Sequence, residues 1–252
     1  MARKRFLRCE GRPVFLSDWR EVLMMHFRVD RAILQAETPF VLDLHDGDAY
    51  VSLVAFRMRR FRFARGGRLA RWVMLPVAEH SFLNVRTYVV HAGEPGIYFL
   101  AEWLPNRLAV LLGPVAFGLP YRYGRLAYEH DEERGMVRGT VEDGTSRDSL
   151  RYSGNLDVED SGVPCGAGTL AEFLMERYTA FTYWRGFRRM FRIWHEAWPQ
   201  LAADVTIEEC PLLERSGAWS RHSSYVGANY STGVNRVWMG RPRALSENDL
   251  RF

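Results

Sequence analysis

Lysine is almost absent from this 252-residue sequence. Its 34 basic residues include a single lysine, Lys4, and all the others are arginine. An arginine-rich composition is most simply explained by a GC-rich genome, but it also has a chemical consequence. Because a Schiff base forms on a lysine amine, the body of the chain has no residue for that route of covalent catalysis.

Cysteines and long apolar runs are also scarce. Cys9, Cys165 and Cys210 are odd in number and lie far apart, which fits a reducing cytoplasm better than a disulfide framework. No run of 18 apolar residues occurs, and the basic start of the chain leads into no apolar segment. We therefore expect no membrane span, no secretory signal and a cytoplasmic location.

The overall composition is that of a folded protein. Hydrophobic residues make up 47% of the chain and charged residues 25%, which is ordinary for a globular protein. No linker, repeat or low-complexity stretch divides the sequence, so we predict one domain over residues 1–252. Residues 1–12 are expected to be a flexible N-terminal tail.

Strand signals dominate the sequence. Runs rich in β-branched and aromatic residues predict strands at 21–29, 49–56, 83–90, 96–101, 134–142, 149–157 and 204–209. The Asp46-Gly47 pair predicts a hairpin turn. Few of these strands are separated by long helical crossovers. The pattern indicates a β-rich α+β fold, a mostly antiparallel sheet or barrel with a few peripheral helices.

Three helices are predicted from their start and stop signals. Asp30 is a good N-cap for a short helix over 31–37, and Gly113-Pro114 should end a helix over 106–112. A capping box at 169–172 opens the clearest helix, in which apolar residues recur at helical spacing until Gly186.

The familiar catalytic and cofactor motifs are missing. The sequence has no P-loop, no Gly-x-Ser-x-Gly and no Cys-x-x-Cys. His195-Glu196 lacks a second histidine one turn later, so we expect no metal site there. Gly166 and Gly168 lack the rest of a dinucleotide-binding fingerprint. We expect no cofactor.

Arginines and aromatic residues alternate in the segment 57–72, a composition that suits nucleic acid. The more common explanation is a strand hairpin with one solvated face. A net charge of +4 is small for this length and permits acidic partners without requiring them. We expect no specific nucleic-acid binding.

Several phrases together resemble one uncharacterised family over about residues 14–242. They are HDGDAYVSLVAF at 45–56, LNVRTYV at 83–89, GIYFL at 96–100, FGLPY at 117–121, LMERY at 174–178 and HEAWP at 195–199. The chain resembles the YqjF-like proteins, the domain of unknown function 2071 family. That family is similar in turn to acetoacetate decarboxylases, which implies a β-rich, cone-shaped barrel enclosing a pocket.

The decarboxylase resemblance can be followed residue by residue. The phrase that carries the Schiff-base lysine in those enzymes matches 118–122 here, and Tyr121 stands at the position of the nucleophile. The arginine near the first strand of the decarboxylases matches Arg20, and their two active-site glutamates fall at Val54 and Phe82. The resemblance implies that the pocket is kept while the Schiff-base chemistry is lost.

The remaining polar residues form a candidate ligand site. An arginine fork binds a carboxylate, and a tyrosine adds a hydroxyl donor inside an apolar cavity. The candidates are Arg20, Arg86, Tyr88, Tyr121, Arg122, Glu102 and His195, with His91 nearby. Because Asn84, Arg86 and Tyr88 alternate along one strand, we expect them to share a face. Several of these residues also have a structural interpretation: Arg86 as an ion-pair partner, the tyrosines as core residues, His195 as part of a packed aromatic cluster, and His91 as solvent-exposed.

Three functions are compatible with these residues. The leading hypothesis is a protein that binds a small, anionic organic acid inside the barrel, without demonstrated chemistry. One alternative is an enzyme that acts on a carboxylate- or carbonyl-containing molecule by acid/base catalysis. Another is a basic RNA-associated protein. The sequence leaves homo-oligomer formation open.

Overall fold

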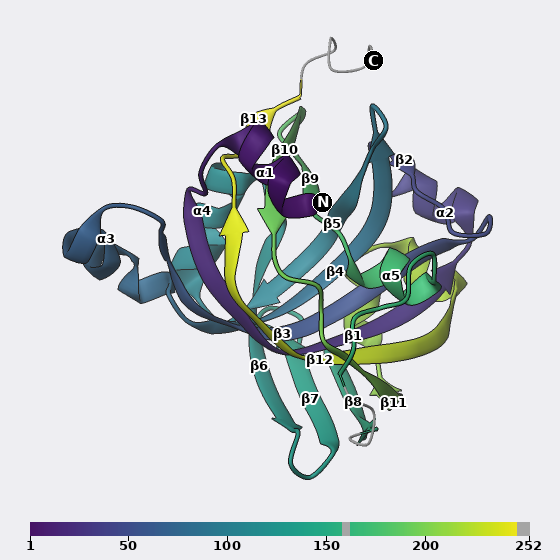
Figure 1. The fold of residues 1–252 in the computed structure, drawn as a ribbon. Coiled ribbons are helices and arrows are strands. Elements are labelled where there is room, and N and C mark those ends of the chain that lie inside the picture. Colours follow the sequence, from purple (N-terminus) through teal and green to yellow (C-terminus); the bar gives the residue numbers. More distant parts are fainter. Residues whose placement is uncertain (158–161, 246–252) are drawn as a thin grey trace.

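The computed structural model describes residues 1–157 and 162–245, and its strands join in one large curled sheet (Figure 1). The strands are β1 (Phe15–Val29), β2 (Val41–Leu42), β3 (Ala49–Phe63), β4 (His80–His91), β5 (Glu94–Leu104), β6 (Tyr121–Asp131), β7 (Met136–Asp143), β8 (Ser149–Leu156), β9 (Thr179–Trp184), β10 (Phe187–Trp194), β11 (Gln200–Glu209), β12 (Ser223–Met239) and β13 (Arg243–Ala244). The helices are α1 (Ala2–Glu10), α2 (Arg31–Ala36), α3 (Gly67–Met74), α4 (Arg107–Phe117), α5 (Leu170–Met175) and α6 (Pro211–Glu214), with 3-10 turns η1 (Leu75–Val77) and η2 (Ala218–His222).

The sheet closes on itself twice because β5 and β12 each change partner along their length. Strand β5 pairs with β4 throughout, with β9 at Ile97 and Tyr98, and with β6 from Glu102 to Leu104. Strand β12 pairs with β11 through 228–231 and with β10 through 238–239. One ring therefore runs β5-β9-β10-β12-β1-β3-β4, and a second runs β5-β6-β7-β8-β11-β12-β1-β3-β4.

This arrangement confirms the predicted β-rich fold with few helices. The prediction of a mostly antiparallel sheet holds for all pairings except β5–β6 and β5–β9, which are parallel. No helix within 1–157 or 162–245 has the length and apolarity that crossing a bilayer requires.

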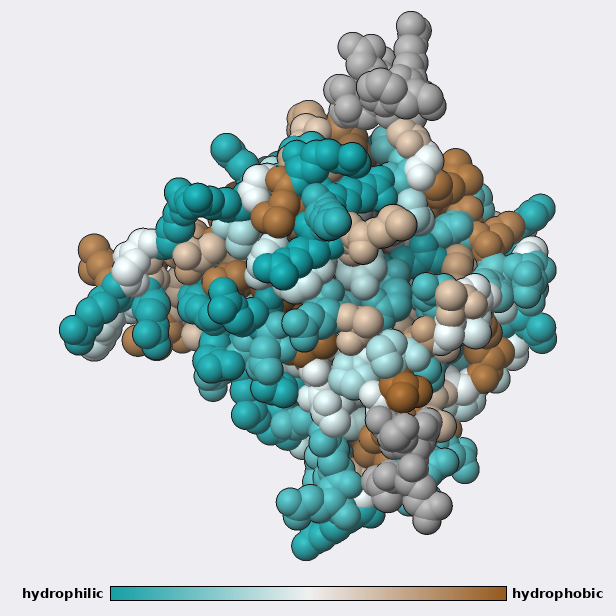
Figure 2. All heavy atoms as spheres, in the orientation of Figure 1, coloured by the Kyte–Doolittle hydropathy of each residue, from teal (hydrophilic) through white to brown (hydrophobic). Residues whose placement is uncertain are grey.

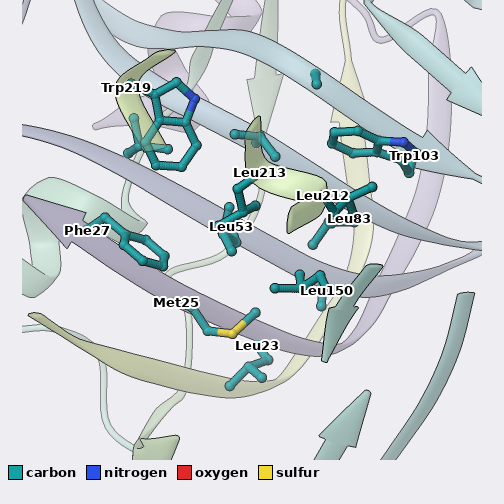
Figure 3. Close-up of a cluster of buried hydrophobic side chains, with 14 of the residues drawn as sticks. Leu23, Met25, Phe27, Leu53, Leu83, Trp103, Leu150, Leu212, Leu213 and Trp219 are labelled. Atoms are coloured by element: carbon teal, nitrogen blue, oxygen red, sulfur yellow. The ribbon is translucent and has the colours of Figure 1, made fainter. Parts of the chain in front are cut away.

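The strands shared by the two rings have apolar side chains on both faces. On β1, Leu23 and Met25 face one core, while Val22 and Met24 face the other. The core that contains Leu23 and Met25 also includes Trp103 (Figure 3). It lies mainly within the second ring, which contains β6, β7, β8 and β11. The core that contains Val22 and Met24 lies within the first ring, which contains β9 and β10, and this core surrounds the cavity described below.

The prediction of one long helix from 169 to 186 is correct only up to Met175 and wrong beyond it. Thr169 does cap α5, accepting a hydrogen bond from the amide of Glu172, but α5 ends at Met175. Residues 179–184 form strand β9 instead. This segment is rich in threonine and aromatic residues, which favour strands. Arg185 and Gly186, both with positive φ, turn the chain into β10, so Gly186 ends a strand rather than a helix.

Three smaller expectations also need correction. Residues 1–12 contain helix α1, whose Phe6 is buried against Trp238, because an amphipathic segment gains free energy by packing. Helix α4 continues through Pro114 to Phe117, and Gly118 caps it with the positive φ typical of a helix C-terminus. The arginine-rich segment is the end of β3 followed by helix α3, and not a hairpin.

Candidate functional site

A cavity of about 80 Å³ lies inside the first ring. Its walls come from β1, β3, β4, β5, β10 and β12, together with Leu119 and Trp198. The lining residues are buried except for Trp19 and Tyr121, which are half-buried. A volume of this size accommodates a few water molecules or a small organic molecule.

Three polar side chains form a row across neighbouring strands in this cavity. Glu102 on β5 lies in register with Asn84 on β4 and with Tyr121 on β6. All three line the cavity. Oε1 of Glu102 and Oδ1 of Asn84 are buried and have no hydrogen-bond partner within the described residues. A ligand here would therefore meet polar atoms that the protein leaves unsatisfied.

Burial controls the charge state of this row. Desolvation raises the pKa of Glu102 well above its ordinary value, so the neutral acid is favoured. Desolvation, and then the neighbouring Glu102 carboxyl, raise the pKa of Tyr121. Both groups can therefore act as neutral hydrogen-bond donors.

Arg86 supplies a positive charge to the same cavity. It is 7% exposed, and its Nη2 donates to the carbonyl of Leu174 at 3.0 Å. Its Nε is buried without a partner, and no ion pair with an acidic side chain is formed within the described part of the chain. A buried charge without a counterion is costly, which makes this position receptive to an anion.

A buried hydrogen-bond chain lies beside Arg86. Tyr88 donates to the same Leu174 carbonyl at 2.8 Å, and its hydroxyl lies 2.5 Å from that of Ser52. His26 Nδ1 lies 2.7 Å from the Ser52 hydroxyl. Tyr88 is fully buried and is not part of the cavity lining. Tyr88 is therefore a core residue that shares a hydrogen-bond acceptor with Arg86.

Three other predicted candidates lie outside the cavity lining. Arg20 donates to Oδ1 of Asn235, and Arg122 donates to the carbonyl of Arg215 while lying over the ring of Trp103. His195 is buried beside Trp19 and Trp198, which do line the cavity.

The two histidines named from the sequence are both enclosed by other side chains. His195 Nδ1 donates to the carbonyl of Glu196, 2.7 Å away, and burial lowers the pKa of His195. His91 is half-buried between Phe40 and Phe181, so its expected solvent exposure is wrong.

Two bulges in the sheet decide which residues face the cavity. Glu21 has a φ of 54°, and the β1–β3 register shifts there. Val22 faces the cavity, so regular alternation along β1 would turn Arg20 toward the cavity as well. Because of the bulge, Trp19 faces the cavity instead. A second shift in the β4–β5 pairing places Phe99 and Glu102 on the same face. Bulges re-aim side chains in this way, and no sequence signal marked either position.

Sequence reasoning also overlooked some participants. Asn84 could have been included, because it shares its strand face with Arg86, whereas nothing marked Ser52 or the Leu174 carbonyl. Val54 and Phe82, where the decarboxylase resemblance places glutamates, do line the cavity and carry no proton-transfer group. Within the described residues, no three His, Cys, Asp or Glu side chains gather in a metal-binding cluster.

Comparison with known proteins places the chain in a family and a fold. The model of a family of uncharacterised conserved proteins, DUF2071, matches residues 17–235. The uncharacterised protein YqjF of Bacillus subtilis is 30% identical over 212 residues, which cover 82% of this chain and 84% of YqjF.

Solved structures with the same fold are distant in sequence. Acetoacetate decarboxylase from Legionella pneumophila has a TM-score of 0.62 at 12% identity, covering 93% of this chain and 88% of that one. The enduracididine biosynthesis enzyme MppR in complex with pyruvate has a TM-score of 0.64 at 13% identity, covering 94% and 92%. The protein shares the acetoacetate decarboxylase-like fold, and by its sequence it belongs to the DUF2071 family.

Proposed function

We propose that this protein binds a small organic acid in the inner cavity, without forming a Schiff base. The observation that carries the proposal is the buried guanidinium of Arg86, whose charge has no acidic partner in the described structure and whose Nε faces no acceptor. A carboxylate at this position would neutralise the charge and accept the unused hydrogen bond.

The row of Glu102, Asn84 and Tyr121 supplies the rest of the recognition. Neutral Glu102 and Tyr121 can donate to a carbonyl or hydroxyl oxygen on the same ligand. The remaining lining is largely apolar, as in most small-molecule sites. A structural relative, MppR, is complexed with pyruvate, a 2-oxo acid, which makes this class the first to test.

Calorimetric titration with pyruvate, 2-oxobutyrate and acetate tests the proposal. Arg86→Met should weaken binding by about 10- to 100-fold, since a charge-assisted hydrogen bond contributes about 1.5–3 kcal/mol. Arg20→Met is the matched control, because Arg20 lies outside the cavity lining. Equal affinities in the wild type and Arg86→Met would contradict the proposal, as would the absence of binding to any small acid.

A second candidate function is proton transfer to or from the bound acid. It is favoured by Glu102, a carboxyl of raised pKa with an unpartnered oxygen in the cavity, since such a group keeps its proton at a pH where an ordinary carboxyl has lost it. Deuterium exchange into the methyl group of pyruvate, followed by NMR, tests this role. Catalysed exchange should disappear in Glu102→Gln while pyruvate binding persists. An unchanged exchange rate in that variant would exclude Glu102.

A further inference from the structure

A second, larger hollow lies on the surface next to the inner cavity. This groove, of about 410 Å³, is bordered by the end of β3, by α3 and η1, and by α4. Several of its side chains are unusually exposed for apolar residues: Val73 is 66% exposed, Leu112 50% and Val115 61%. Figure 2 shows hydrophobic residues on the surface at the left edge of the molecule, where α3 lies in Figure 1.

The groove and the inner cavity share one wall. The residues that line both are Met58, Phe82, Leu119, Tyr121, Phe191 and Met239. The boundary between them is therefore a single layer of side chains. Two of its members are methionines, whose unbranched side chains change conformation readily. Tyr121 belongs to this layer and is half-buried, so the row of polar groups in the cavity begins at the inner end of the groove.

The two spaces differ in chemistry. Arg86, Glu102 and Asn84 line the inner cavity and do not line the groove. The groove lining is apolar apart from Tyr121 and His80, and burial lowers the pKa of His80 to about 4, so it is neutral at pH 7. A molecule that occupied both spaces would need an anionic, hydrogen-bonding head and an apolar body.

We propose that the ligand is an amphipathic carboxylic acid whose carboxylate meets Arg86 and whose apolar chain passes Tyr121 into the groove between α3 and α4. This inference rests on the proposed function and adds the class of acid. The shared layer of side chains favours a small amphiphile over a second copy of the chain as the occupant. A protein surface packed on the groove would leave the inner cavity empty, whereas an amphiphile can fill both spaces.

A homologous series of straight-chain acids tests the inference: propionate, butyrate, hexanoate, octanoate and decanoate, all below the concentration at which they form micelles. Titration calorimetry on the full-length protein should show the dissociation constant falling about fourfold for each methylene that enters the groove, the equivalent of about 0.8 kcal/mol per buried methylene. Binding of every member should weaken in Arg86→Met.

A matched pair of variants locates the chain. Leu112 lines the groove, whereas its neighbour Leu111, 70% exposed on the same helix, is outside the lining. Leu112→Asn should weaken decanoate binding about tenfold and leave propionate unchanged, and Leu111→Asn should affect neither.

The outcomes separate this inference from the proposed function. If short acids bind through Arg86 but affinity is independent of chain length, the amphiphile inference is wrong and the proposed function stands. If no acid binds, both are wrong. Sedimentation that shows a dimer disrupted equally by Leu111→Asn and Leu112→Asn, with no dependence on chain length, would assign the groove to a second copy of the chain.

Discussion

Glu102 on β5 lies in register with Tyr121 on the parallel strand β6, and both side chains line the inner cavity. The two strands pair here over three residues only, at the point where β5 leaves β9 and joins the second ring. The change of strand partner therefore brings a carboxyl and a phenol together in an apolar space. Neither group has an ordinary pKa in this setting.

The first prediction concerns the effect of Glu102 on stability. Desolvation raises its folded-state pKa well above the ordinary value of 4.5, so the folded protein holds this proton more tightly than the unfolded chain does. Below pH 4.5 the contribution of Glu102 to the free energy of unfolding is at its maximum. This contribution is lost as the pH rises toward the folded-state pKa, because the unfolded chain ionises first. Glu102→Gln should remove that loss and be increasingly more stable than the wild type as the pH rises.

Urea denaturation at several pH values from 4 to 8 measures this difference. Between pH 4.5 and the folded-state pKa of Glu102, the difference in unfolding free energy between Glu102→Gln and the wild type should rise by up to about 1.4 kcal/mol per pH unit. Glu142→Gln, on a half-exposed side chain of β7, is the control and should run parallel to the wild type. A stability difference between Glu102→Gln and the wild type that does not vary with pH would contradict the prediction.

The second prediction concerns acid. His26 is buried beside Ser52, and desolvation, followed by the charge of Arg86, lowers its pKa from 6.5 to about 3. Stability from this group is present above pH 6.5 and is lost as the pH falls toward 3, because the unfolded chain takes up the proton first. His26→Gln should flatten the acid side of the stability curve, by up to about 1.4 kcal/mol per pH unit.

The acidic half of the same denaturation series, from pH 4 to 7, checks this result. His222→Gln is the matched control, since His222 is exposed. If both variants follow the wild-type curve, His26 does not titrate differently in the folded and unfolded states, and the prediction is wrong.

The sequence was sufficient for those parts of the fold that depend on local signals. Asp30 caps α2, accepting from the amides of Ala32 and Ile33, as its residue type predicts. Alternation on β4 correctly placed Asn84, Arg86 and Tyr88 on one face. Such patterns operate over a few residues, and they survive folding when the backbone stays regular.

The rest depended on contacts between distant segments. Residues 179–184 have both helical spacing and strand-forming residue types, and pairing of β9 with β10 and β5 decides in favour of the strand. Arg20 was a candidate for the ligand site, and it lies outside the cavity lining because of a bulge at Glu21. No sequence pattern indicated the positive φ of Glu21. One extra residue in a strand was enough to exchange Arg20 for Trp19.

The third prediction concerns covalent chemistry. Tyr121 occupies the place that the decarboxylase resemblance gives to a lysine nucleophile, and a phenol cannot form a Schiff base. Incubation with pyruvate or acetoacetate and borohydride should leave no reduced adduct on residues 5–252, and acetoacetate should not be decarboxylated. Peptide mass spectrometry, with Lys4→Arg as a control, checks this. An adduct on any internal residue would contradict it.

The fourth prediction is that nucleic acids bind weakly and without sequence preference. The arginines of the 57–71 segment do not form one free basic face: Arg57 and Arg59 pair with Glu21, and Arg60 pairs with Asp18. With a net charge of +4, the protein can displace few counterions from a phosphate backbone. Fluorescence anisotropy with single-stranded RNA and duplex DNA should give dissociation constants no tighter than about 1 μM at physiological salt. Arg68→Ala, on exposed helix α3, should weaken this residual binding equally for all sequences, because a phosphate contact carries no base information. Nanomolar binding that persists as the salt concentration is raised would show instead that the arginine-rich segment is a recognition surface.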